Sequence, residues 1–160
     1  LVMLPHLSGA MAPEANPKAK GVFYGATLRH TKGHFIRSIM EAIGFIVMRN
    51  IRAVESMGID VGEIRVLGGG SRSDGWNQIK ADITGRVVVT TEYSDAACLG
   101  AAILGGSAVG LFDDLGDAAA RMVNLKKRFA PDPENHKVYQ EQFEHYLALY
   151  DALCPSFERF

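Results

Sequence analysis

Three consecutive glycines followed by a serine form the segment of this sequence best suited to bind a ligand. In residues 66–76 (VLGGGSRSDGW), apolar strand residues run into Gly68, Gly69 and Gly70, and a helical pattern opens at Ser73. Glycines let the backbone approach a ligand closely, and the free N–H groups of a helix start attract a phosphate or hydrogen-bond a nucleoside. The pattern favours a nucleotide site, and the alternative is a tight strand-to-helix turn without a ligand.

A dinucleotide site is a second interpretation of the same segment. Gly68-x-Gly70-x-x-Ser73 after a strand approaches the Gly-x-Gly-x-x-Gly fingerprint, and Glu92 lies 22 residues beyond Gly70, where an acid could bind a ribose. Ser73 in place of the third glycine weakens the close helix-to-strand packing that the fingerprint requires. This interpretation would make the chain a nicotinamide-dependent oxidoreductase domain. A catalytically silent nucleotide-binding or interaction module is a third hypothesis.

Three other groups of residues are candidates for weaker reasons. His30 and His34 are four residues apart at a helix start and could share a metal, although no third ligand follows closely and solvated histidines are the more common outcome. The small residues of segment 95–102 (DAACLGAA) indicate a helix that packs closely on a neighbour. The basic run 126–128 (KKR) is more typical of a solvated edge than of a nucleic-acid patch.

The elements that must position the glycine turn alternate between strands and helices. Three prolines and a glycine predict an irregular loop over residues 4–17. Period-two and period-3.6 patterns predict the rest: strands at 21–27, 63–67 and 86–90, helices at 31–58, 73–84, 95–109 and 114–123, an extended segment at 125–129, and a final helix from 132. Alternation of this kind implies parallel strands with helices packed on the sheet faces.

Two helices carry clear apolar faces in this reading. Apolar residues spaced three and four apart share one face of a helix. In the first long helix these residues are Ile36, Ile39, Ile43, Val47, Ile51 and Val54. In the last helix they are Tyr139, Phe143, Tyr146, Tyr150 and Leu153. Thr31 and Gly58 are suited to cap the first of these helices at its two ends. Trp76 and the aromatic stripe are expected in the core.

Composition excludes several classes of protein. The chain has 160 residues, 48% of them apolar and 22% charged, with a net charge of −1, so neither disorder nor nucleic-acid binding is expected. The length suits a single domain, residues 1–160, with one core. The two cysteines form no metal or redox motif, and the longest uncharged run, 96–112, is short of a membrane span. We therefore expect a cytoplasmic protein without a membrane partner.

Several motifs in a fixed order give the chain a resemblance to a known family. They are residues 4–9 (LPHLSG), 19–25 (AKGVFYG), 41–44 (EAIG), Gly68-Gly-Gly-x-x-Ser73 with Trp76, 81–85 (ADITG), 99–102 (LGAA), and a final set of Phe129, Pro131, Asn135, Tyr139, Tyr146, Leu149 and Tyr150. Together they resemble the C-terminal domain of the FGGY family of carbohydrate kinases, above all its members that phosphorylate xylulose.

The resemblance implies a fold, a reaction and a set of site residues. The fold is α/β, a partial actin-like or ribonuclease-H-like domain with a mixed sheet and helices on both faces. The reaction is transfer of the γ-phosphoryl group of ATP, with Mg²⁺ carried by the nucleotide, to a hydroxyl of a sugar such as xylulose or a related ketose or polyol. Gly69, Gly70 and Ser73 match positions that contact ATP, and Gly68 supports the turn.

The chain also departs from the family pattern. Ala10 and Met11 follow Gly9 where Glu-Arg is common, and Asp95 stands where glutamate is common. No residue corresponds to the catalytic aspartate or to the two phosphate-binding hairpins, which in the family lie upstream. The sequence opens at Leu1 without a methionine, so we expect a piece of a longer chain whose N-terminal sugar-binding domain is absent. By itself it should be inactive, with an exposed sheet edge that favours association with the rest of its chain or into a homo-oligomer.

Overall fold

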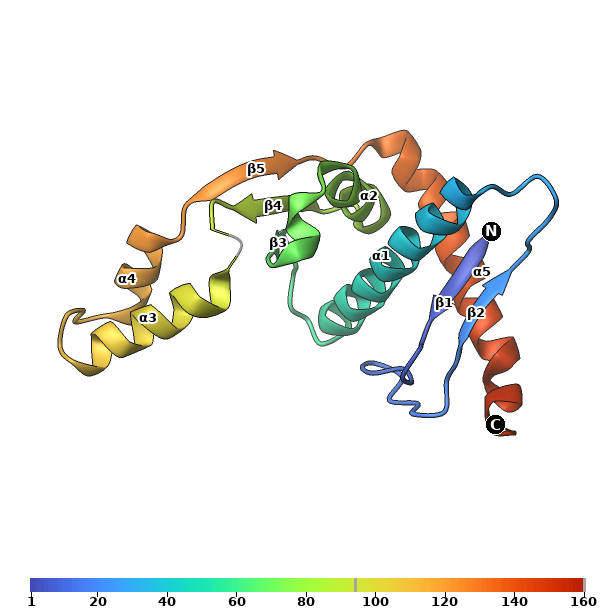
Figure 1. Cartoon of the computed structure of the whole chain (residues 1–160), viewed down its shortest axis with the longest axis horizontal. Coiled ribbons are helices and arrows are strands. Elements are labelled where there is room, and N and C mark those ends of the chain that lie inside the picture. The colour runs from blue at the N-terminus through green and yellow to red at the C-terminus, as the bar shows by residue number, and fades with distance from the viewer. Residues whose placement is uncertain (94, 160) are drawn as a thin grey trace.

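The computed structural model describes residues 1–93 and 95–159, which form an elongated molecule (Figure 1). A helix-rich body holds both ends of the chain, and a small helical arm projects from it. The elements in chain order are β1 (Val2–Pro5), β2 (Gly21–Tyr24), α1 (Lys32–Ser56), β3 (Glu63–Val66), the 3₁₀ turn η1 (Gly69–Arg72), α2 (Asp74–Thr84), β4 (Val87–Thr91), α3 (Ala96–Ala108), α4 (Leu115–Met122), β5 (Leu125–Phe129) and α5 (Pro133–Phe157).

Two small sheets organise the strands. β1 and β2 pair antiparallel, with Met3 opposite Phe23. In the other sheet, of order β3-β4-β5, β3 runs parallel to β4 and β5 runs antiparallel to it. The second sheet is therefore mixed, as predicted. β2 does not pair with β3 in the described chain.

The N-terminal segment corrects one sequence-based expectation. Residues 4–17 were expected to be an irregular loop because of their prolines, but Leu4 and Pro5 belong to β1. Pro5 is tolerated because it is the last residue of a strand that pairs on one side only. Beyond it the chain does lack regular structure, apart from two isolated bridges, Leu7 with Gly9 and Ala10 with Asn16.

An aromatic core holds α1, α5 and β1 together. Phe45 of α1 contacts the rings of Tyr139, Phe143 and Tyr146 of α5, with centroids 5.3–6.2 Å apart. Leu4 of β1 is fully buried in the same cluster. The four aromatic residues of the stripe predicted for the last helix are all buried, so that prediction is confirmed.

The apolar face predicted for the first helix is only partly correct. Thr31 caps α1 as expected, but Ile36 and Ile39 are exposed. The buried residues are Ser38, Ala42, Gly44, Phe45, Met48 and Ile51. α1 therefore has apolar side chains on two faces. One face packs on α2 and β1 and, through Phe45, on α5. Val47 and Val54 of the other face line a shallow groove beside β3.

A buried carboxylate connects α2 to the start of α5. Asp82 accepts hydrogen bonds from the backbone N–H of Asp132 (2.9 Å), from Asn135 Nδ2 (3.0 Å) and from Gln78 Nε2 (2.7 Å). It is 4% exposed. These bonds compensate for the loss of hydration that a buried charge would otherwise suffer. They fix α2, which directly follows the glycine turn, against the start of α5.

The end of α2 requires a glycine for two independent reasons. Gly85 adopts φ +65°, the left-handed conformation that ends a helix, and its N–H donates to the Ala81 carbonyl. A Cβ at this position would also lie 2.6 Å from Cε1 of His136. The backbone therefore turns into β4 in direct contact with α5.

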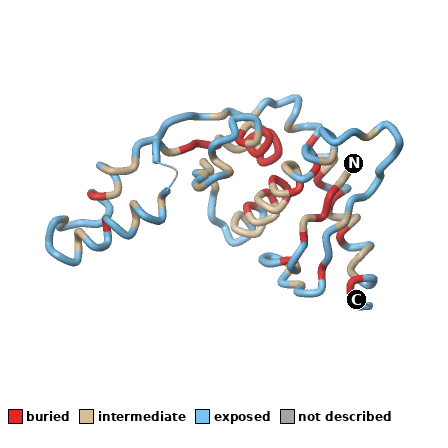
Figure 2. Tube along the Cα trace, viewed as in Figure 1, coloured by how far each residue is buried: buried red, intermediate tan, exposed pale blue. Residues whose placement is uncertain are grey.

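The arm formed by α3 and α4 has almost no interior. Ile103 and Ala118 are the buried residues of its two helices, and most of the arm is exposed in Figure 2. Leu104, Val109 and Leu111 are 61–83% exposed. The expectation that the small residues of segment 95–102 pack closely on a neighbour is not met at Gly100, where an added Cβ would meet no atom within 4 Å. Close packing occurs instead at Gly106, further along α3, where an added Cβ would lie 2.5 Å from the Phe112 ring. No helix of the described chain is long and apolar enough to cross a membrane.

Candidate functional site

The glycine turn lies at the carboxyl end of β3, where the chain bends into η1 and then α2. Gly68 has φ +74° and ψ −166°, a conformation that a residue with a side chain rarely adopts. The Ser71 N–H (3.1 Å) and Oγ (2.7 Å) both donate to the Gly68 carbonyl and close the turn. The backbone N–H groups of Gly69 and Gly70 come first in η1, so they have no acceptor within it.

Ser73 begins α2 as its N-cap. Its Oγ accepts the Trp76 N–H at 3.3 Å, which leaves the hydroxyl proton available to another acceptor. Asp74 follows in the first turn, where a negative charge complements the helix dipole. Asp74 forms an ion pair with Lys127 of β5 at 2.6 Å. The basic run that includes Lys127 is exposed on the edge strand of its sheet, as predicted.

Two residues of α2 support the turn from beneath. Asn77 is fully buried, and its Nδ2 donates to the Ser71 carbonyl at 2.7 Å. Trp76 donates from Nε1 to the Met40 carbonyl of α1, and its ring lies 3.2 Å from where a Gly70 Cβ would be. Trp76 is half-buried, so it bridges the turn to α1 instead of filling the core as predicted.

Lys80 is the most unusual group near this site. It is 7% exposed, its Nζ donates to Asn77 Oδ1 at 3.2 Å, and the same atom lies 4.4 Å from the centroid of the Trp76 ring. No carboxylate of the described residues forms an ion pair with it. Burial lowers the pKa of the Lys80 ammonium because desolvation disfavours the charged form.

A polar hollow of about 260 Å³ adjoins the turn. It lies where the carboxyl ends of β3 and β4 meet the start of β5, which is the usual place for ligands in sheets with parallel strands. Its lining residues are Ser71, Arg72, Asp74, Thr90, Thr91, Glu92, Lys126 and Lys127. The structure thus places Glu92 and the lysines of the basic run near the turn.

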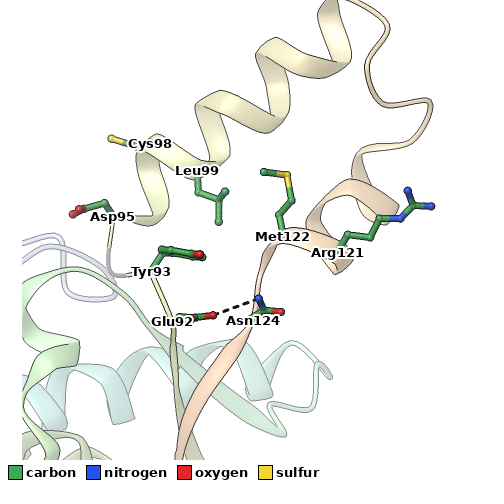
Figure 3. Close-up of a pocket in the computed structure, with 8 residues that line it drawn as sticks. All are labelled: Glu92, Tyr93, Asp95, Cys98, Leu99, Arg121, Met122 and Asn124. Carbon is green, nitrogen blue, oxygen red and sulfur yellow. Dashed lines mark hydrogen bonds between the residues drawn. The ribbon is translucent and has the colours of Figure 1, made fainter.

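A larger open hollow of about 710 Å³ continues from Glu92 to the base of the arm (Figure 3). The Asn124 Nδ2 group donates to Glu92 across the strand ends at 3.4 Å. Asp95 and Cys98 border the hollow from the start of α3, and Arg121 from α4. The glycine turn does not line this hollow, so we centre the candidate site on the turn.

The four predicted site residues lie together in the structure, but they are not equivalent. Gly69 and Ser73 are exposed, whereas Gly68 and Gly70 are half-buried. A Cβ at Gly69 would meet no atom within 4 Å, so the space above it is open to a ligand. The sequence reading missed Asn77 and Lys80. Asn77 lies four residues beyond Ser73, and Lys80 lies four residues beyond Trp76. Polar residues at such helix positions are normally solvated, so no local pattern in the sequence identifies these two.

The histidine pair does not form a metal site. The His30 and His34 rings lie with their centroids 5.4 Å apart, yet each Nδ1 accepts a local backbone N–H, from Thr27 and Thr31. Both residues therefore serve the start of α1. Among residues 1–93 and 95–159, no group of three His, Cys, Asp or Glu side chains could hold a metal ion.

Comparison with known proteins places this geometry in a family. Residues 1–109 match the model of the FGGY family of carbohydrate kinases, C-terminal domain. The chain is 37% identical over 154 residues to gluconokinase of Bacillus licheniformis and 33% identical over 153 residues to xylulose kinase of Escherichia coli (strain K12). The matches cover 96% and 95% of this chain. This chain belongs to the FGGY family of carbohydrate kinases.

A solved structure agrees on the fold. Gluconate kinase from Lactobacillus acidophilus superposes with a TM-score of 0.87 at 29% identity and covers 100% of this chain. The expected actin-like, ribonuclease-H-like fold class is thereby confirmed, and the dinucleotide interpretation of the turn gains no support. The chain spans about a third of the length of these relatives, 30% and 31% of the two curated sequences and 32% of the solved chain.

Proposed function

We propose that these 160 residues are the ATP-binding C-terminal part of a carbohydrate kinase, which transfers the γ-phosphoryl group of ATP to a sugar hydroxyl. Gly68, Gly69, Gly70 and Ser73 form part of the nucleotide site. The observation that carries the proposal is the glycine turn at the end of β3, with open space above Gly69 and a capped helix start at Ser73. Membership in the kinase family favours ATP as the nucleotide.

The turn would contribute positioning to the reaction. Backbone N–H groups and the Ser73 hydroxyl can hydrogen-bond the nucleotide, while the open space at Gly69 lets it approach the backbone. Phosphoryl transfer depends on such positioning and on stabilisation of charge at the γ-phosphate. Mg²⁺ would arrive on the phosphates, because the described residues include no cluster of three potential metal ligands. When bound, Mg²⁺ would neutralise developing charge on the phosphoryl oxygens.

The sugar, the base that accepts its proton and the remaining phosphate contacts would come from protein outside these 160 residues. We infer this from the relatives, of which the chain covers about a third. The relatives include a gluconokinase and a xylulose kinase. Xylulose or a related ketose or polyol is our proposed substrate, and a cytoplasmic location and possible self-association remain part of the proposal. A panel of pentuloses, hexuloses, aldonates and polyols tests the substrate, and gluconate as the preferred one would contradict it.

Substitution of Gly69 tests the nucleotide site directly. Gly69→Val should raise the dissociation constant for ATP about tenfold or more, because a branched side chain enters the space a ligand needs. Gly62→Val is the matched control, since Gly62 is also exposed with no atom within 4 Å of its Cβ position. Calorimetry with ATP and NAD on the protein at its full natural length measures both variants. Tighter binding of NAD than of ATP would contradict the proposed ATP site.

The chain alone should not phosphorylate sugars. A coupled assay of ADP release with the purified 160-residue chain, ATP, Mg²⁺ and the same sugar panel should show only background. Turnover by the chain alone would contradict the proposed division between a nucleotide side and a sugar side.

A further inference from the structure

Lys80 carries a buried positive charge that no carboxylate of residues 1–93 and 95–159 neutralises through an ion pair. The side chain is 7% exposed, and its polar contacts are one amide oxygen, Asn77 Oδ1, and the face of the Trp76 ring. An ammonium group has three donors, and burying it without a carboxylate costs free energy. A methionine or leucine would fill the same space on α2 without that cost. The charge therefore calls for an explanation other than packing.

Both contacts of the ammonium lead to the glycine turn. Through Asn77, which donates to the Ser71 carbonyl at 2.7 Å, Lys80 connects to η1. Through Trp76 it connects to Gly70, because the indole ring lies 3.2 Å from the position of a Gly70 Cβ. A single side chain, Asn77 on one path and Trp76 on the other, thus separates the Lys80 ammonium from the turn. Charges in a poorly solvated interior act over longer distances than charges in water.

The other acids and bases near the turn do not cancel this charge. Asp74 is paired with Lys127 at 2.6 Å. Asp82, on the same helix, forms no ion pair with Lys80, and its carboxylate accepts hydrogen bonds from Gln78, Asn135 and the Asp132 backbone. Glu92 and Lys126 belong to the neighbouring hollow, so they are on the solvent side of the turn. Lys80 is therefore the buried charge beneath it.

We propose that Lys80 is a specificity-determining residue that favours nucleotides bearing phosphates over the bare nucleoside. The inference rests on the proposed nucleotide site at Gly68–Gly70 and Ser73. Its uncompensated charge lies beneath the turn and offsets the negative charge of a bound polyphosphate. The ligand contacts the turn, and Lys80 acts from below without touching it. Binding of the phosphates thereby supplies the counter-charge that the folded chain lacks.

The test compares ATP with adenosine in two variants of the protein at its full natural length. Lys80→Met removes the charge and keeps an apolar stem, and Lys80→Gln keeps an amide that can bond to Asn77. Both variants should raise the dissociation constant for ATP about fivefold or more, and that for adenosine less than twofold. Raising the salt concentration should reduce the difference between wild type and variants. Lys20→Met is the control, because Lys20 is exposed and precedes β2.

Each outcome decides between distinct ideas. Equal weakening of ATP and adenosine would show that Lys80 only supports the fold, and would overturn the inference. Unchanged ATP affinity in both variants would also overturn the inference. If Lys80→Gln kept its ATP affinity while Lys80→Met lost it, the effect would come from the hydrogen bond to Asn77 and not from the charge, and the inference would again be overturned. Failure of the wild type to bind ATP would overturn the proposed function itself, and this inference with it.

Discussion

α5 and the arm of α3 and α4 both contain many apolar residues but bury them to different extents. α5 places Tyr139, Phe143, Tyr146 and Tyr150 on one face and buries all four against α1 and β1. In α3, apolar residues occur on every side, and Ile103 alone is buried among its described residues. A helix with an apolar stripe specifies its own packing partner, whereas a helix that is apolar all round needs cover from several sides. The arm lacks that cover in this chain.

The largest difference should appear in the stability of the two regions. Phe143 is 1% exposed and stacks between Phe45, Tyr146 and the Arg52 guanidinium. Phe143→Ala should lower the free energy of unfolding by about 3–5 kcal/mol. Ile103→Ala in the arm should cost less than half of that, because few neighbours surround it. Urea denaturation followed by circular dichroism measures both, and equal losses would show that the arm is packed as tightly as the core.

The polar connection between α2 and α5 should rank next. Asp82→Ala removes a buried acceptor that receives three hydrogen bonds and should cost about 2–3 kcal/mol. Asp151→Ala is the control on the exposed side of α5 and should stay within about 0.5 kcal/mol. If thermal unfolding gave the two variants the same midpoint, the bonds of Asp82 would contribute nothing to joining these helices.

The body should also respond to acid through His6. This residue is 4% exposed, with its ring against Tyr150 (5.2 Å between centroids) and beside the ion pair of Glu14 and Arg49. Burial lowers the pKa of His6, the Arg49 charge lowers it further, and Glu14 opposes both. His6 thus binds fewer protons in the folded state than in the unfolded state. Its contribution to the free energy of unfolding is therefore complete above pH 6.5 and falls as the pH drops below 6.5.

Substitution of His6 isolates its contribution to the pH dependence of the unfolding free energy. His6→Gln should flatten the fall in the unfolding free energy between pH 6.5 and 5, whereas His145→Gln, on α5 but outside this cluster, should leave it unchanged. The unfolding free energy at several pH values provides the measurement. A fall of the same size without His6 would assign the acid sensitivity to other groups.

The smallest effect on stability should come from the exposed arm. Leu104→Ser and Val109→Ser change side chains that are 61% and 83% exposed, so the unfolding free energy should shift by no more than about 0.5 kcal/mol. The same pair should reduce self-association measured by sedimentation velocity, because exposed apolar patches favour contacts between molecules. A large loss of stability would show that these residues pack in solution.

The order and boundaries of most elements follow from local rules. Thr31, Ser73, Asp114 and Asp132 all cap helices, as sequence patterns of polar residues before apolar periodicity predict. The faces of α1 could not be assigned this way, because Ile36 and Ile39 have the correct spacing yet remain exposed, while Gly44 and Ser38 are buried. Which of two apolar faces is buried depends on the neighbouring elements, and spacing along one helix does not contain that information.

The glycine turn could be located from sequence, but its support could not. Gly68–Gly70 and Ser73 are adjacent in the chain, so their proximity is guaranteed. Asn77 and Lys80 lie on α2 and support the turn through hydrogen bonds: Asn77 donates to the Ser71 carbonyl of η1, and Lys80 donates to Asn77. A lysine on a helix is normally solvated, and no local pattern distinguishes this one.

Gly85 shows how a single position can join two parts of a protein. Its left-handed backbone and its contact with His136 exclude side chains for unrelated reasons. A substitution tolerated by the turn geometry, such as asparagine, would still collide with the imidazole. Relieving the collision by shortening His136 would leave the backbone strain in place. Rescue of a lost glycine here therefore requires both a residue that adopts the left-handed conformation and a shorter side chain at position 136, so the α2–β4 corner should resist redesign more than the nucleotide turn itself.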